Sequence, residues 1–325
     1  MTHKSWEPSA LDSFEGLDGS FLECWTRAVR DVLYQAGFGE ALFAVLQPLD
    51  FRISLDRRGV VEWLRGAGDL RSGHCHLGVD ATWRAFNDGH QALDLCRAML
   101  EDGRAVPLIP DINRLPESFW FGQNDTRRHA LVLTALDGSE AIVSDRRVLP
   151  TGLSRVRLDG LQEALNDCYV CDWQVGVPNS PPGRELDGIL KASVANLHQD
   201  EWLSGVQGIL ALPDLIAGLM DRSVRIRELV FQRRLATSLL TVEGSRRHLH
   251  LVLGSGHPPT TRRCVAEFHL QTSWKAWEAL RRVLYLMGWS SDAQVPDALE
   301  ARVREVHQAE LRVRDALGEL SSWGY

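Results

Sequence analysis

The sequence of 325 residues lacks a long apolar run and lacks an excess of basic residues. No stretch approaches the roughly 20 apolar residues that a helix needs to cross a bilayer, and the first residues lack the apolar core of a signal peptide. The formal net charge of −7 gives no electrostatic basis for general binding to nucleic acid or to anionic membranes. We therefore expect a soluble cytoplasmic protein that binds neither nucleic acid nor membranes.

Cysteine is also sparse, with six residues in the whole chain. Without a secretory signal we expect free thiols rather than a disulfide framework. Two short segments have some metal-binding character. GHCHLG, residues 73–78, offers two histidines and a cysteine, too few ligands for a zinc site, and CYVC, residues 168–171, lacks a second pair at zinc-ribbon spacing. The sequence therefore predicts no metal and no bound cofactor.

The apolar pattern divides the chain into a mixed part and a mostly helical part. Up to residue 177 predicted helices and strands are interspersed, whereas later apolar stripes have helical spacing. Residues 178–188 are rich in proline and glycine and predict a linker. We expect an α+β protein with an N-terminal domain at 1–177, this linker, and a helical C-terminal domain at 189–325. The N-terminal domain is predicted to contain helices at 20–36 and 89–102 and strands at 104–112, 128–136 and 140–145.

Cys24 lies where a helix is predicted to begin, a position that favours the reactive form of cysteine. In SFLECWTRAVRDVLYQAGFG, Ser20 and Glu23 form the S-x-x-E pattern of a capping box, and Gly37 ends the helix. The field of a helix N-terminus lowers the pKa of a thiol in the first turn. Cys24 is therefore the first candidate nucleophile, against the alternative of a small buried side chain. Cys75, which stands between two histidines, is the second candidate.

A cysteine nucleophile needs a base, and the base needs an orienting group. His129 opens the predicted strand HALVLTAL, and Asp145 closes the next strand, AIVSD. Because the start of one strand lies beside the end of the next in a tight antiparallel hairpin, we expect His129 and Asp145 to be neighbours. Cys24, His129 and Asp145 are the candidate catalytic triad, although each alone has an ordinary structural interpretation.

The order of these motifs resembles a known family, that of butirosin biosynthesis protein H, and more distantly the double-glycine leader peptidases. The resemblance covers about residues 15–170. It rests on the segments CWTRAVRDVLYQAG, LEDGRAVPLIPDI, HALVLTALDGSEAIVSD and LDGLQEALN. The resemblance implies a papain-like fold for the N-terminal domain, with the candidate triad as its active site.

The resemblance also implies a reaction, acyl transfer from a carrier-protein thioester to an amine in natural-product assembly. Cys24, deprotonated with help from His129, would attack the thioester carbonyl, and the pantetheine thiol would leave an acyl-Cys24 intermediate. His129, oriented by Asp145, would then deprotonate the incoming amine, which takes the acyl group. The implied partners are an acyl or peptidyl carrier protein with its phosphopantetheine and a small amine acceptor.

Two departures from the family pattern keep other classes open. Glu23 stands where the family often has histidine, and the region before the cysteine, EGLDGS, lacks the oxyanion-hole glutamine of the leader peptidases. The Cys24 backbone N–H is one available donor, and Gln123 or Asn124 is a candidate for another. The alternatives are a cysteine hydrolase (thioesterase or peptidase) with the same triad, and a non-catalytic papain-like binding protein.

An arginine-rich segment, DRSVRIRELVFQRR, stands out in this acidic chain. Such a run is most often a solvated helix face. The functional alternative is a docking surface for an acidic carrier protein and its phosphate-bearing arm. Its arginines are Arg222, Arg225, Arg227, Arg233 and Arg234.

Overall fold

The computed structural model describes most of the chain from residue 24 to residue 322. The described residues are 24–67, 75–118, 121–122, 128–144, 153–178, 181–199, 201–220, 222–223, 226–227, 229–255, 260–288 and 297–322. Six residues named above lie outside them, namely Ser20, Glu23, Gln123, Asn124, Asp145 and Arg225. The expected α+β class is confirmed, with a sheet in the N-terminal part and helices in the C-terminal part. Among the helices described, none is long and apolar enough to span a bilayer.

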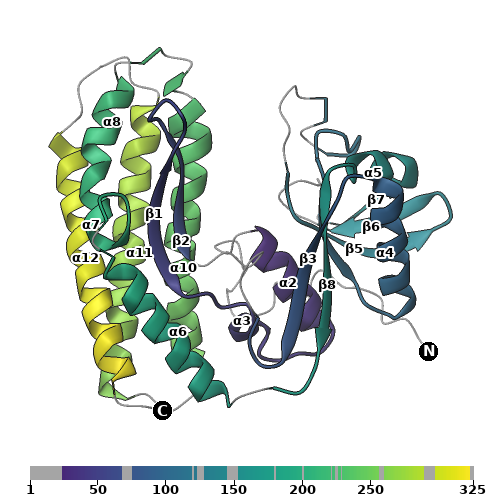
Figure 1. The fold of residues 1–325 in the computed structure, drawn as a ribbon, viewed down its shortest axis with the longest axis horizontal. Coiled ribbons are helices and arrows are strands. Elements are labelled where there is room, and N and C mark those ends of the chain that lie inside the picture. Colours follow the sequence, from purple (N-terminus) through teal and green to yellow (C-terminus); the bar gives the residue numbers. More distant parts are fainter. Residues whose placement is uncertain are drawn as a thin grey trace. The chain divides into compact units, whose positions relative to one another are not determined.

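The chain folds as two compact units (Figure 1). Unit 1 comprises Met1–Val45 and Leu70–Asn179, and unit 2 comprises Leu46–Asp69 and Ser180–Tyr325. The expected boundaries at 1–177 and 189–325 are therefore corrected at one place. Leu46–Asp69, expected in the N-terminal domain, belongs to the helical unit.

Unit 1 is built on a six-stranded antiparallel sheet with the strand order β3-β8-β4-β5-β6-β7. The predicted hairpin is confirmed, since Asp137 pairs with Glu140 across a turn in which Gly138 has φ +60. The strands are β3 Val79–Phe86, β4 Val106–Ile109, β5 Leu131–Asp137, β6 Glu140–Ser144, β7 Leu153–Arg157 and β8 Cys168–Val175. The helices are α2 Cys24–Gln35, α3 Ala41–Ala44, α4 Gly89–Glu101 and α5 Leu158–Ala164.

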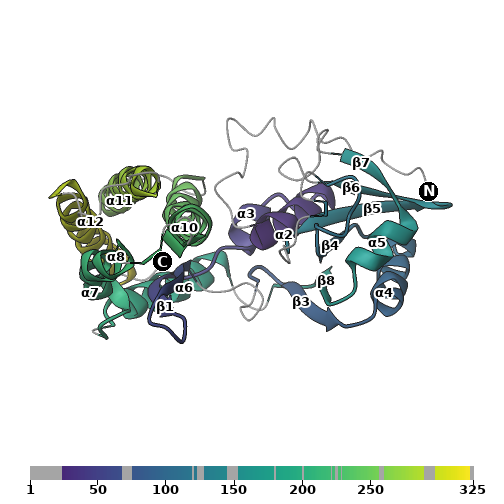
Figure 2. The same ribbon diagram turned by 90° about the horizontal axis from the view of Figure 1, so that it is seen from above.

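Helices α2 and α4 cover opposite faces of this sheet (Figure 2). The strand register places Trp83 and Tyr169 on one face, because paired residues share a face and successive residues alternate. Trp25 of α2 contacts both rings, so α2 begins over that face. Cys168 alternates with Tyr169 and lies near Cys96 of α4, so α4 covers the other face. The core of unit 1 lies on both sides of the sheet.

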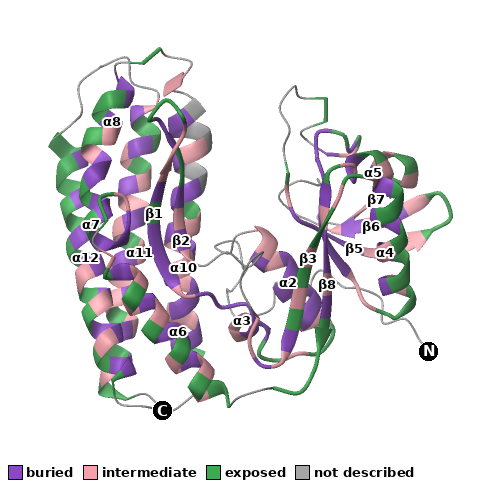
Figure 3. Cartoon of the chain, viewed as in Figure 1, coloured by how far each residue is buried: buried purple, intermediate pink, exposed green. Residues whose placement is uncertain are grey.

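Unit 2 combines long helices with a two-stranded hairpin. Helices α10 and α12 both pack against α11, while α6 packs against α12 and β1. Strand β1 is mostly buried (Figure 3). The strands are β1 Leu49–Leu55 and β2 Val61–Ala67. The helices are α6 Pro182–Leu197, α7 Gly205–Gly208, a 3-10 helix at Ile209–Ala211, α8 Leu212–Met220, a π-helix at Leu229–Leu235, α10 Ala236–Ser255, α11 Thr261–Met287 and α12 Asp297–Ser321.

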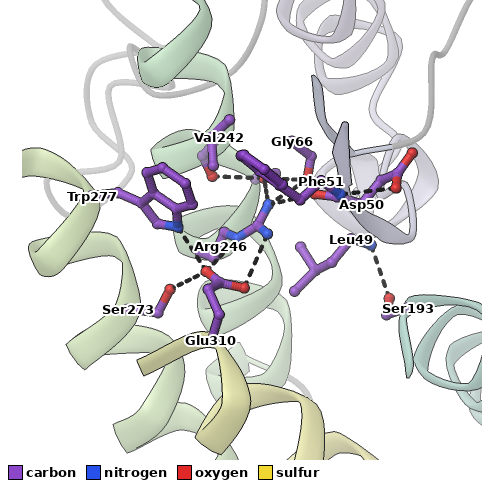
Figure 4. A network of polar contacts seen from close by, with 11 residues as sticks. Leu49, Asp50, Phe51, Gly66, Ser193, Val242, Arg246, Ser273, Trp277 and Glu310 are labelled. Carbon is purple, nitrogen blue, oxygen red and sulfur yellow. Dashed lines mark hydrogen bonds and ion pairs between the residues drawn. The ribbon is translucent and has the colours of Figure 1, made fainter. Parts of the chain in front are cut away.

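A buried polar network holds the β1–β2 hairpin to the helices (Figure 4). Arg246 of α10 and Glu310 of α12 are fully buried and form an ion pair, with 2.9 Å between Arg246 Nε and Glu310 Oε1. Arg246 Nη1 also donates to the carbonyls of Asp50, at 3.1 Å, and of Gly66. The hairpin belongs to the helical unit because its carbonyls solvate a charge that is buried there.

Close packing strengthens the same attachment. Phe51 of β1 stacks on Trp277 of α11 with 5.3 Å between ring centroids. A Cβ at position 66 would lie 2.3 Å from Val242 Cα, so only glycine permits β2 to approach α10 this closely.

Candidate functional site

Cys24 occupies the first turn of α2 as the structure describes it, and its free thiol is half-buried. The helix is anchored by Val29, Val32 and Leu33, which are almost fully buried. It packs against β4 and β5. The prediction that Cys24 lies in a helix is confirmed, whereas the start of this helix before Cys24 lies outside the described residues. The apolar stripe of α2 therefore sets the position of Cys24 relative to the sheet.

An aromatic cluster lies beside Cys24, formed by Trp25, Trp83 and Tyr169. The Trp25 ring is 5.4 Å from that of Trp83 and 5.7 Å from that of Tyr169, measured between centroids. The cluster joins the start of α2 to β3 and β8. Sequence analysis did not identify it, because the three residues are far apart in the chain.

The segment that carries His129 approaches the same cluster. His129 N–H donates to the Pro110 carbonyl at 3.4 Å, and Arg128 forms a backbone bridge with Asp111. The Arg128 guanidinium carbon lies 5.6 Å from the centroid of the Tyr169 ring. The start of α2 and the segment before β5 therefore meet at Tyr169.

Arg128, not His129, is the side chain directed to Tyr169. The register between β4 and β5 continues without slip to the Asp111–Arg128 bridge. Successive residues of an extended chain point to opposite faces, so His129 is directed away from the side that Arg128 occupies. The described contacts thus join the neighbours of Cys24 and His129.

The position of Asp145 lies outside the described residues. The described part of the hairpin ends at Ser144, which pairs with Val132. That His129 and Asp145 are neighbours stays a prediction, and so do the roles of Glu23, Gln123 and Asn124.

The second candidate nucleophile, Cys75, lies in an unsuitable environment. Burial, with a smaller effect from the charge of Asp80, raises the pKa of the Cys75 thiol to about 12. Burial likewise raises the pKa of Cys96 and of Cys168 to about 12, and that of Cys171 well above its ordinary value. These four thiols are protonated near neutral pH and are poor nucleophiles.

No group of three or more metal-ligating side chains occurs within the described residues. In GHCHLG, His74 lies outside them. In CYVC, Cys168 and Cys171 are three residues apart on one strand, so they face opposite sides of the sheet. Two thiols on opposite faces cannot bind one ion without unfolding β8.

One arginine of the arginine-rich segment makes contacts within unit 2. Arg234 Nη1 lies 3.5 Å from Asp56 Oδ2 and donates to the Val61 carbonyl at 3.3 Å. It fixes the π-helix to the hairpin. Arg222 is exposed, and Arg225 lies outside the described residues.

The comparisons with known proteins add no relative, since no family model matches the chain and the search of curated proteins finds no match.

Proposed function

We propose that unit 1 is a papain-like domain that moves an acyl group from a carrier-protein thioester to an amine through an acyl-Cys24 intermediate. One observation carries this proposal. Cys24 is a free, partly exposed cysteine on α2, and its neighbour Trp25 joins the aromatic cluster that the Arg128 side chain also reaches through Tyr169. The other four cysteines described in unit 1 have raised pKa values, and the exposed Cys264 lies on α11 of unit 2.

The proposed reaction has two steps. The Cys24 thiolate attacks the carbonyl carbon of the thioester, the bond from that carbon to the pantetheine sulfur breaks, and the departing thiolate takes a proton. An amine then attacks acyl-Cys24, loses a proton to the base, and restores the free thiol. His129 is the proposed base and Asp145 its proposed orienting group.

The nucleophile is tested by intact-protein mass spectrometry after incubation with an acyl-pantetheine thioester. Wild type and Cys264→Ala should each gain one acyl mass, and Cys24→Ala should gain none. Addition of an amine should remove the adduct and release the amide. Free acid instead of amide would favour the hydrolase. An adduct of equal yield on Cys24→Ala would reject the proposal.

The base is tested separately. His129→Ala should slow adduct formation by about a hundredfold or more, the scale of general-base catalysis. His90→Ala is the matched control, because His90 is an exposed histidine on α4 of the same unit. If His129→Ala formed the adduct as fast as the wild type, His129 would not be the base, and the role of Cys24 would still stand.

A non-catalytic binding domain is the second candidate function. It is favoured by the strand alternation that turns Arg128, and not His129, toward the aromatic cluster beside Cys24. In that case acyl-pantetheine would bind to the protein without an adduct and without turnover.

A further inference from the structure

Arg128 differs from every other arginine described in unit 1. Within the described residues of this unit, it alone has no carboxylate at ion-pair distance. The pairs of the others are Arg27 and Arg30 with Asp31, Arg84 with Asp172, Arg97 with Asp94, Arg104 with Asp102 and Asp172, Arg114 with Asp111, Arg155 with Asp137 and Glu140, and Arg157 with Asp159.

The contacts around Arg128 hold its charge in place without neutralising it. Its backbone partner, Asp111, directs a carboxylate oxygen to Arg114 at 3.4 Å and accepts from the Asn113 N–H at 3.2 Å. The Arg128 guanidinium instead lies over the Tyr169 ring and is exposed. An arginine stacked on an aromatic ring keeps its N–H donors available at the edge of the guanidinium.

A second donor in the same cluster is also unpaired. Trp83 Nε1 is buried and has no hydrogen-bond partner. A buried N–H without an acceptor is costly, and such groups are rare in folded proteins. Trp83 Nε1 is covered by its neighbours, so the donors of this cluster that a ligand can reach are those of the exposed Arg128. The cluster also includes Trp25, which directly follows Cys24 on α2.

We propose that Arg128 binds a carboxylate carried by the acyl group that reacts at Cys24. A guanidinium binds a carboxylate with two parallel N–H···O bonds, a geometry that a neutral acyl chain cannot offer. The substrate class is therefore an acyl thioester with a second, free carboxylate. The choice of a thioester rests on the proposed function, whereas the anion site rests on Arg128 itself.

Binding is separated from reaction in a Cys24→Ala background by calorimetry. The probes are glutaryl-pantetheine and pentanoyl-pantetheine, which have the same chain length and differ in the terminal carboxylate. The glutaryl probe should bind about tenfold more tightly, the scale of one charge-assisted pair. Adding Arg128→Gln should abolish this preference. Adding Arg97→Gln, which removes an exposed arginine of the same unit, should leave it unchanged.

A third probe shows whether Arg128 binds the carboxylate of the acyl group or the phosphate of phosphopantetheine. If Arg128 prefers a phosphate, pentanoyl-phosphopantetheine will gain affinity in an Arg128-dependent way and the glutaryl group will not, which overturns the carboxylate assignment. Equal affinity for the glutaryl and pentanoyl probes, a preference that persists in Arg128→Gln, or no binding of the glutaryl probe also overturns it.

Substitutions of Tyr169 test whether its ring positions the Arg128 guanidinium. Tyr169→Phe keeps an aromatic face under the guanidinium and should preserve the preference, whereas Tyr169→Leu should reduce it. Equal retention in both variants would reject the proposed positioning of Arg128 by the ring.

The two proposals fail in different ways. With the cysteine intact, an adduct that forms equally from both probes supports Cys24 catalysis and rejects carboxylate recognition. Arg128-dependent binding of the glutaryl probe without any adduct supports recognition and rejects catalysis.

Discussion

The polar network of unit 2 and the aromatic cluster of unit 1 contain similar residues, but they differ in whether the donors are paired. In unit 2, Arg246 pairs with Glu310, and the Trp277 indole N–H donates to the same carboxylate at 2.7 Å. Among the described residues of unit 1, Arg128 has no carboxylate partner and the Trp83 indole N–H has no acceptor. The unit 2 network is explained by stability alone, whereas the exposed guanidinium of Arg128 is available to a ligand. The exposure and pairing of the arginine, and not residue type, distinguish the functional candidate.

The largest loss of stability is expected when the buried ion pair of unit 2 is broken. Glu310→Ala leaves the buried Arg246 charge without its partner and should lower the free energy of unfolding by about 3–5 kcal/mol. Denaturant unfolding monitored by circular dichroism measures this loss.

Glu305→Ala is the matched control on the same helix. Glu305 pairs with Arg302 at the surface, and its loss should cost less than about 1 kcal/mol. If Glu310→Ala cost no more than Glu305→Ala, the buried network would not be what attaches the hairpin.

A smaller loss is expected where β2 meets α10. Gly66→Ala forces a methyl group against the Val242 backbone and should destabilise the protein by about 1–3 kcal/mol. Gly188→Ala in α6 meets no atom within 4 Å and should stabilise by about 0.5–1 kcal/mol. Thermal unfolding of both variants checks the opposite signs. Destabilisation of similar size in both would contradict the close approach.

The change of stability with pH is the smallest expected effect near neutral pH, and it grows in alkali. The folded-state pKa of Cys75 is raised from 9.0 to about 12 by burial, so the stability it contributes is complete below pH 9.0 and is lost as the pH rises toward 12. Each such thiol contributes a slope of about 1.4 kcal/mol per pH unit in this range. Cys75→Ala should flatten the alkaline loss of stability, and Cys264→Ala should not. Identical slopes for both variants would contradict burial of Cys75.

The Glu310 contribution to the stability of unit 2 should instead be lost in acid. Burial alone would raise the pKa of Glu310, but the Arg246 charge and the hydrogen bonds from Arg246, Ser273 and Trp277 outweigh it and lower the pKa below the ordinary 4.5. The contribution of Glu310 is therefore present above pH 4.5 and is lost as the pH falls further. Hydrogen exchange of peptides from β8 and α12 across pH, corrected for intrinsic rates, would separate the two units. Earlier acid opening of β8 than of α12 would contradict this assignment.

Local patterns predicted the elements that depend on neighbours in sequence. The helix that carries Cys24, the helix that begins at Gly89 and the turn at Gly138 all follow from spacing and turn chemistry. The place of Leu46–Asp69 did not, because the partner of the Asp50 carbonyl, Arg246, is 196 residues away.

The candidate site was predictable to the same limited extent. Cys24 was found from its helix, whereas the aromatic cluster depends on the pairing of β3 with β8. The turn of Arg128 toward Tyr169 depends on the register of β4 with β5. Pairing between distant strands leaves no pattern in the local sequence. The role of Arg128 could therefore be suspected only from its position directly before His129.

The most direct test of the central claim is the alkylation rate of each cysteine by iodoacetamide near neutral pH, mapped by peptide mass spectrometry. If Cys24 is the nucleophile, it should react fastest, and faster than the exposed Cys264. Cys75 should react slowly because its pKa is raised, and the buried Cys96, Cys168 and Cys171 should react only after denaturation. A Cys24 that reacts no faster than Cys264 would contradict the assignment of Cys24 as a nucleophile.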